Sequence, residues 1–248
     1  MRCQPRRDNP VYIWLKKEQI CLLCDEPSDG PLELCSACEA ELPWLGGHCQ
    51  ICALPLPLPS HSLTCGACLR KPPAFERVEA AWRYDFPLDA LITRFKHQAQ
   101  WPLGRLLGDL LSHHLQHAFS EGLPRPDLLL PVPLSSRRLR QRGFNQAAML
   151  TRWLSHSLQL PLAEHLLRRA RDTAAQQQLT AAQRQRNLRQ AFQLAPDGQV
   201  NGLHLAIVDD VLTTGATAHH LARLLLNAGA RRVDVYCLAR TPKPDGPL

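Results

Sequence analysis

The chain has 248 residues, a formal net charge of +7 and ten cysteines, so it is long enough for one mid-sized domain and a small additional module. Its N-terminal apolar run, "VYIWL", is shorter than a secretory signal requires, and no run approaches the about 20 apolar residues of a membrane-spanning helix. These features argue against an exported or membrane-spanning chain, and we expect a cytoplasmic protein.

Eight of the cysteines form four pairs with two-residue spacers, "CLLC", "CSAC", "CQIC" and "CGAC". Such a spacing lets one tight turn direct two thiolates at the same ion, and a second turn completes a tetrahedron. Pairing the turns in order predicts two structural zinc sites, with the ligands Cys21, Cys24, Cys35 and Cys38 in one and Cys49, Cys52, Cys65 and Cys68 in the other. Interleaved pairing, redox dithiols and a disulfide scaffold are the alternatives.

The cysteine-rich segment is too short and too rich in proline and glycine to bury much of a core unaided. Zinc would supply the missing stability, about 10 kcal/mol or more per site by analogy with zinc-finger peptides. His48 or His61 could replace a thiolate, although solvated loop positions are expected for both. Cys3 and Cys237 have no partner in the pattern, and Cys237 is expected to be a small buried residue.

The composition changes after "KPPAF", which marks a domain boundary near residue 72. We expect an N-terminal lead at 1–18, a double zinc ribbon at 19–71, a larger domain at 72–242 and a tail at 243–248.

Hydrophobic periodicity in the larger domain predicts alternating strands and helices. Strands are expected at 77–85, 126–133, 203–210 and 231–239, and helices at 86–99, 102–118, 144–158 and 217–229. Short apolar strands that alternate with helices indicate an α/β fold, with a mostly parallel sheet covered on both faces. In such sheets ligands bind beyond the carboxyl ends of the strands.

One of those ends carries the motif "AIVDDVLTTGAT", residues 206–217. A turn at the start of a helix offers backbone N–H groups and a positive dipole end, which suit a phosphate. The turn residues are Thr213, Thr214, Gly215, Ala216 and Thr217. Two carboxylates one turn earlier would repel that phosphate but can accept hydrogen bonds from the hydroxyls of its sugar. Asp209 and Asp210 together with the turn therefore predict a ribose 5-phosphate pocket.

Two other interpretations of this motif are simpler. The acids could cap a helix or be solvated, with the threonines forming an ordinary turn. A Walker B strand is excluded because none of the 13 glycines is followed by lysine, so no P-loop is present. The dinucleotide, metalloprotease and hydrolase motifs GxGxxG, HExxH and GxSxG are absent as well.

Basic charge is concentrated in residues 131–189, which contain eleven arginines and only two acidic residues. Such a stretch attracts phosphates, and arginine favours bidentate contacts with them. The phosphates could belong to a small ligand or to a nucleic acid.

These motifs together identify a resemblance. "AIVDDVLTTGAT" resembles the PRPP (5-phosphoribosyl diphosphate) motif of type I phosphoribosyltransferases. With the paired cysteines, "RFKHQAQ", "PVPLSSRRLRQRGFNQA" and "QLTAAQRQRNLRQAF", the chain is similar to the ComF/GntX family of DNA uptake and utilisation over residues 20–241. The resemblance implies a type I phosphoribosyltransferase-like domain behind a double zinc ribbon.

The resemblance also implies roles for particular residues. Asp209 and Asp210 would hold the ribose hydroxyls, and residues 213–217 the 5-phosphate. Candidates for contacts with the pyrophosphate are Arg137, Arg138, Arg140 and Arg142, and a flap over the site would include Arg184, Arg186 and Asn187. Lys96 and His97 match the family's pattern without a role that can be derived, and an ordinary surface position suits them equally.

The implied reaction expels pyrophosphate from the anomeric carbon, with Mg²⁺ and arginine neutralising the leaving group. The acceptor is undetermined. Three functions stay open: a phosphoribosyltransferase, a non-catalytic protein that keeps the pocket as a sensor or scaffold for DNA uptake, and a direct binder of single-stranded DNA. Aromatic residues that could stack on bases are sparse among the arginines, which weakens the third.

Overall fold

A computed structural model describes residues 19–57, 63–169, 191–196 and 198–243. The chain divides into two compact units, Met1–Ala40 and Glu41–Leu248. The described part of the first unit contains the first two cysteine pairs and the short helix α1 (Ser36–Ala40). The domain boundaries expected near residues 19, 72 and 242 stay predictions, since compact packing and zinc binding divide a chain by different criteria.

In the second unit, four of the described strands form a parallel sheet in the order β1-β6-β5-β2. The strands are β1 (Arg77–Arg83), β2 (Leu128–Pro131), β5 (His204–Leu212) and β6 (Arg232–Arg240). Their almost continuous burial explains their apolar runs, because a parallel strand is covered on both faces. The predicted strands and their parallel arrangement are confirmed.

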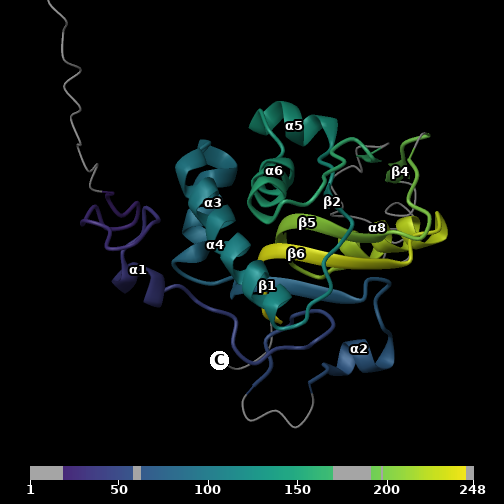
Figure 1. Ribbon diagram of the computed structural model, residues 1–248, viewed down its shortest axis with the longest axis horizontal. Coiled ribbons are helices and arrows are strands. Elements are labelled where there is room, and N and C mark those ends of the chain that lie inside the picture. Colours follow the sequence, from purple (N-terminus) through teal and green to yellow (C-terminus); the bar gives the residue numbers. More distant parts are fainter. Residues whose placement is uncertain (1–18, 58–62, 170–190, 197, 244–248) are drawn as a thin grey trace, which may run out of the picture. The chain divides into compact units, whose positions relative to one another are not determined.

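Helices cover both faces of this sheet (Figure 1). Along β6, Val235 and Cys237 pack into a core cluster with residues of α8 (Ala216–Asn227). The alternate residue Tyr236 contacts Phe119 of α4 (Trp101–Ser120) on the other face. That face also carries α3 (Leu88–Gln98) and α6 (Gln146–Leu158), both of which pack on α4. The expected α/β arrangement is therefore present.

Several described elements lie outside the predicted set. A short helix begins within each of the second and fourth cysteine pairs and contains the second cysteine of the pair; these helices are α1 and α2 (Gly66–Arg70). Part of the arginine-rich segment forms α5 (Ser136–Arg142). A two-stranded antiparallel ladder joins β3 (Leu167–Arg169) to β4 (Phe192–Leu194). These segments are too short for hydrophobic periodicity to reveal them.

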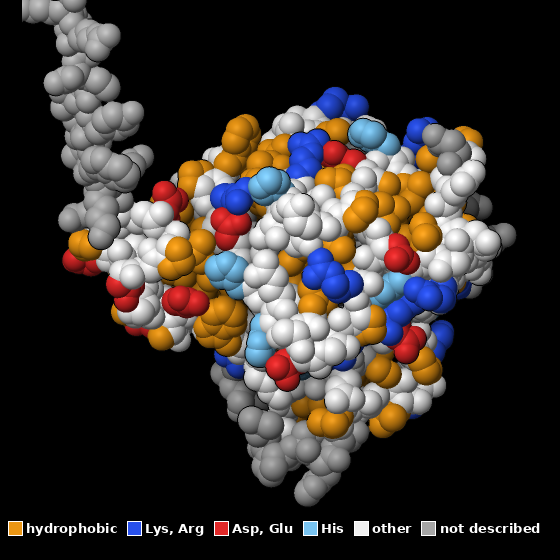
Figure 2. Space-filling model, viewed as in Figure 1, with side chains coloured by type: hydrophobic (Ala, Val, Ile, Leu, Met, Phe, Trp, Pro, Cys, Tyr) orange, Lys and Arg blue, Asp and Glu red, His pale blue; other side chains and the backbone are white. Residues whose placement is uncertain are grey.

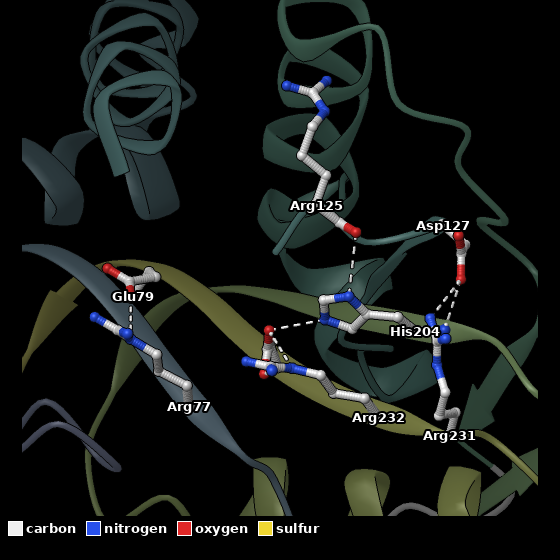
Figure 3. Close-up of polar contacts among 8 residues, drawn as sticks. Arg77, Glu79, Arg125, Asp127, His204, Arg231 and Arg232 are labelled. Atoms are coloured by element: carbon white, nitrogen blue, oxygen red, sulfur yellow. Dashed lines mark hydrogen bonds and ion pairs between the residues drawn. The ribbon is translucent and has the colours of Figure 1, made fainter. Parts of the chain in front are cut away.

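A buried polar cluster lies where β5 and β6 begin (Figure 3). The ring of His204 places Nε2 2.8 Å from Asp234 Oδ2 and Nδ1 3.2 Å from the carbonyl oxygen of Arg125. Arg232 Nε donates to both oxygens of the same aspartate at 3.1 Å. Every charged group of this cluster has a partner, as buried charges require. It fastens the amino ends of the strands, on the edge of the sheet opposite to the predicted pocket.

Candidate functional site

The predicted acid pair lies inside strand β5, near its carboxyl end. The sequence placed the end of this strand at Asp210, which is wrong by two residues. The strand continues because Val211 and Leu212 keep their pairing with Ala239 and Arg240 of β6. The acids are therefore held on a regular strand, and the loop that follows them is short.

The loop between β5 and α8 has the shape that a phosphate site needs. Gly215 adopts a φ of 74°, a left-handed conformation in which any side chain would be strained. The first helical hydrogen bond of α8 runs from His219 N–H to the Gly215 carbonyl at 2.8 Å. The N–H groups of Ala216 and Thr217 therefore have no intrahelical acceptor.

The first part of this loop is accessible to solvent. Thr213 and Thr214 are exposed, and the hydroxyl of Thr214 accepts a hydrogen bond from the Ala216 N–H at 3.3 Å. Hydroxyls and N–H groups thus surround one end of a helix dipole. Phosphate binding here stays a prediction, and the geometry is compatible with it.

The two acids have different surroundings. Asp210 is only 4% exposed, and its Oδ1 accepts the N–H of Val211 at 2.7 Å. Asp209 accepts the N–H of Asp210 at 2.9 Å. Burial raises the pKa of Asp209 well above its usual range, and the adjacent Asp210 charge raises it further. Two neighbouring carboxylates in a dry site are costly unless something supplies protons or positive charge.

Lys96 supplies such a charge. Its ammonium group lies 2.8 Å from Asp210 Oδ2, and its side chain is only 17% exposed. The residue comes from α3, far away in the sequence, so no local pattern could have placed it at the acid pair. The ordinary surface position considered for Lys96 is therefore not what the structure has. A ribose hydroxyl that reaches Asp210 must share this carboxylate with the ammonium group.

The four candidate arginines for pyrophosphate lie on α5. This helix follows β2, whose neighbour in the sheet is β5, so both segments leave the same edge of the sheet. Ser135 caps the helix by accepting the Arg138 N–H at 3.3 Å. Arg137, Arg138 and Arg140 are exposed, and basic side chains gather at the upper rim of the face in Figure 2, over α5. Within the described part of the chain, no carboxylate pairs with them.

A cleft of about 870 Å³ lies beside α5. Trp101, Phe144 and Met149 form part of its apolar wall, and Arg168 lies at its edge on β3. The flap candidates Arg184, Arg186 and Asn187 lie outside the described residues. No hydrogen bond or ion pair between described residues joins the α5 arginines to the loop at 213–217.

Both sets of four cysteines are assembled in the order that the sequence predicted. In each set, the four sulfur atoms all lie within 4.8 Å of one another. The Sγ atoms of Cys24 and Cys35 are 3.7 Å apart, as are those of Cys52 and Cys65. A zinc ion with Zn–S bonds of about 2.3 Å needs sulfurs about 3.8 Å apart. The residues present therefore fit two structural zinc ions.

In each set, one cysteine has surroundings that favour the thiolate. Burial opposes ionisation of Cys21 and Cys49, but backbone N–H groups outweigh it and lower the pKa to about 6 for Cys21 and about 7 for Cys49. Thiolates are the form that binds zinc. His48, the described alternative ligand, instead places Nδ1 2.6 Å from the carbonyl oxygen of Gly46. No helix among the described residues has the length and apolar character needed to cross a membrane.

Comparison with known proteins matches two family models. Residues 18–69 match the double zinc ribbon domain and residues 145–247 the phosphoribosyl transferase domain. The α/β unit therefore has a phosphoribosyltransferase-like fold.

Curated relatives match over most of the chain. The DNA utilization protein YhgH of Salmonella typhi is 41% identical over 90% of this chain and 97% of its own length. Competence protein F of Haemophilus influenzae is 35% identical over 84% of this chain and 90% of its own. Competence protein ComFC of Bacillus subtilis is 26% identical over 90% of this chain and 95% of its own.

Proposed function

Since the chain belongs to the family of DNA utilization protein YhgH and competence protein F, we propose that it binds PRPP or a related ribose 5-phosphate and acts in DNA uptake or utilisation. The observation that carries the proposal is the arrangement at the carboxyl end of β5. An acid pair precedes an open loop of hydroxyls and N–H groups that begins a helix. That arrangement offers acceptors to a sugar and donors to its phosphate.

In the proposed complex, the carboxylates of Asp209 and Asp210 accept hydrogen bonds from the ribose hydroxyls, and residues 213–217 surround the 5-phosphate. Lys96 stays beside Asp210 and offsets the negative charge that the ligand brings. The arginines of α5 neutralise the diphosphate. Their exposure supports this role, because they are available to a ligand that enters from solvent.

Mg²⁺ would enter with the diphosphate of the ligand. Among the described residues, the metal-binding clusters consist of cysteines, and no carboxylate cage accompanies the acid pair. Mg²⁺ typically keeps several waters and uses substrate phosphates as ligands, so a protein cage is not required. When bound, it would supply charge neutralisation of the departing pyrophosphate.

Catalysis would need more than binding. The site would have to stabilise positive charge at the anomeric carbon and exclude water from the activated sugar. The carboxylates beside the ribose suit the first need.

A reducing compartment such as the cytoplasm would keep eight zinc-binding thiolates reduced.

Calorimetry tests the proposal directly. PRPP with Mg²⁺ should bind the full chain with a stoichiometry of one, and Asp210→Asn should weaken that binding. Asp109→Asn, which changes a partly exposed carboxylate on α4 paired with Arg105, is the matched control and should bind as wild type does. Absence of binding at millimolar PRPP would contradict the proposed function. Release of pyrophosphate with a panel of nucleobases would then separate a transferase from a sensor.

Binding of single-stranded DNA is the second candidate. It is favoured by one observation, the exposed Trp101 in the cleft beside the α5 arginines. A base could stack on the indole while arginines neutralise phosphates. Binding should then weaken steeply with salt, and the salt slope should survive Asp210→Asn. A loss of DNA binding in Asp210→Asn would favour a single ribose-phosphate site instead.

A further inference from the structure

The second cysteine cluster is attached to the sheet that carries the proposed site. Its surrounding segment lies along the edge strand β1, where Val78 N–H donates to the Ile51 carbonyl at 2.9 Å. Leu45 N–H donates to the Ala81 carbonyl of the same strand at 3.0 Å. Ile51 and Cys52 also pack against the core cluster that includes α8. The segment around the second cysteine cluster therefore belongs to the same packed body as the loop between β5 and α8.

Arg240 joins the two sites through one guanidinium group. It is the last residue of β6 and is only 6% exposed. Its Nε donates to the carbonyl of Cys52 at 2.9 Å. Its Nη1 donates to the carbonyl of Leu212 at 3.1 Å and also to that of Thr213. One side of the guanidinium thus holds a predicted zinc ligand, and the other holds the start of the phosphate loop.

Two further contacts run in parallel with this one. The N–H of Ala74 donates to Nδ1 of His219, in the first turns of α8, at 2.9 Å. Partial burial and the charges of Arg223 and Lys71 lower the pKa of His219, which favours the neutral ring that such an acceptor requires. The ring of Phe75 comes within 3.8 Å of the position that a Cβ would take on Gly215. The loop is therefore braced by the segment that follows the fourth cysteine pair.

We propose that Arg240 is a positioning residue that couples the second zinc site to the phosphate loop, so that zinc occupancy and ribose-phosphate binding strengthen each other. The inference rests on the proposed function. Without zinc, Cys52 loses its ligand bond, and the carbonyl that fixes one side of the guanidinium is no longer held. The other side of the guanidinium then has less reason to keep the Leu212 and Thr213 carbonyls in place. Because such coupling is reciprocal, binding of the ribose-phosphate ligand must also strengthen the binding of zinc at the second cluster.

The two clusters allow a test within one molecule. The full chain with both zinc ions is treated with excess chelator, and the freed cysteines are alkylated and measured by mass spectrometry over time. The chelator must be selective for zinc, so that Mg²⁺ stays with PRPP. Saturating PRPP with Mg²⁺ should then slow exposure of the second cluster by at least about fivefold, the lower range of typical coupling. The first cluster lies in the other compact unit and is the internal control for zinc chelation by the ligand itself.

Arg240→Met should bind two zinc ions and still bind PRPP, more weakly, but the ligand should no longer protect the second cluster. Arg240→Lys should restore part of the protection because its ammonium group can still donate hydrogen bonds to a nearby carbonyl. Arg105→Met, which changes an exposed arginine of α4, is the matched control and should behave as wild type does. Circular dichroism checks the fold of each variant, and where Arg240→Met does not fold, the wild-type comparison and Arg240→Lys carry the test.

The outcomes separate the two proposals. If PRPP binds in calorimetry but protects neither cluster, or protects both equally, the coupling is overturned while the proposed function stands. If Arg240→Met keeps full protection of the second cluster, Arg240 is not the coupling residue. If PRPP does not bind at all, the proposed function fails and this inference fails with it.

Discussion

The two ends of strand β5 treat buried charge in opposite ways. At the amino end, His204 lies between Asp234 and a carbonyl oxygen, and Arg232 completes the cluster. At the carboxyl end, Asp209 and Asp210 are adjacent, and the lysine ammonium group that lies against them contacts only Asp210. The first end is a set of charges with matched partners, whereas the second has an excess of negative charge. Fold stabilisation explains the first arrangement and does not explain the second.

This difference separates structural from functional polar residues. A satisfied buried cluster should lose much stability when one member is removed. An incompletely compensated acid should cost stability while it is present, and its removal should harm binding instead. Measurements of stability and of ligand binding on the same variants can therefore break or sharpen the comparison.

The largest expected effect on stability is at the amino end. Asp234→Asn removes the buried carboxylate charge that the His204 ring and the partly buried guanidinium of Arg232 contact. We expect a loss of about 3 to 5 kcal/mol in the free energy of unfolding, measured by urea denaturation. The matched control Asp109→Asn breaks a partly exposed i,i+4 pair with Arg105 on one helix and should cost about 0.5 kcal/mol. Equal losses in the two variants would show that the buried cluster contributes no more to the stability of the fold than the pair on α4 does.

Asp210→Asn should have a mixed effect. It breaks the ion pair with Lys96 but also removes the repulsion between adjacent acids, so a loss of about 1 to 2 kcal/mol is expected in the free energy of unfolding. The dissociation constant for PRPP should rise roughly tenfold or more, because a charge-assisted hydrogen bond to a ribose hydroxyl is lost.

A double-mutant cycle with Lys96→Met isolates the ion pair. The sum of the stability losses in the two single variants should exceed the loss in the double variant by about 1 kcal/mol. Additive losses would show that the pair contributes nothing to stability.

Residue spacing alone was enough to predict the features that depend on neighbours in the chain. The cysteine knuckles, the acid pair and the loop at 213–217 are local, and the parallel sheet follows from apolar periodicity. The contacts of Lys96 and Arg240 could not be predicted in this way. Arg240 and Cys52 are 188 positions apart, and an arginine that ends a strand looks like any surface residue until packing brings it to a carbonyl. Helix α5 was missed because its arginines show no apolar periodicity.

Asp209→Asn should stabilise the protein at neutral pH, which sets it apart from Asp210→Asn. The folded pKa of Asp209 is raised, so the protonated form is favoured in the folded state. The stability that protonated Asp209 contributes to the folded state is fully present below the unfolded pKa of about 4. It is lost as the pH rises through the folded pKa. The variant should therefore match wild type near pH 4 and exceed it by about 1 kcal/mol at pH 8, measured by urea denaturation. A variant less stable than wild type at pH 8 would contradict the cost assigned to this charge.

The smallest effect on stability is expected on α5. Arg138→Gln and Arg140→Gln change exposed side chains that pair with no carboxylate in the described ranges, so the free energy of unfolding should change by less than about 0.5 kcal/mol. Affinity should nevertheless fall for PRPP and hardly change for ribose 5-phosphate, because only PRPP carries a diphosphate. Gln141→Ala on the same helix is the control, and it should leave calorimetric affinity for both ligands unchanged. If both ligands weakened equally, the arginines would act through the general field of the protein, and the assignment of α5 to the diphosphate would be wrong.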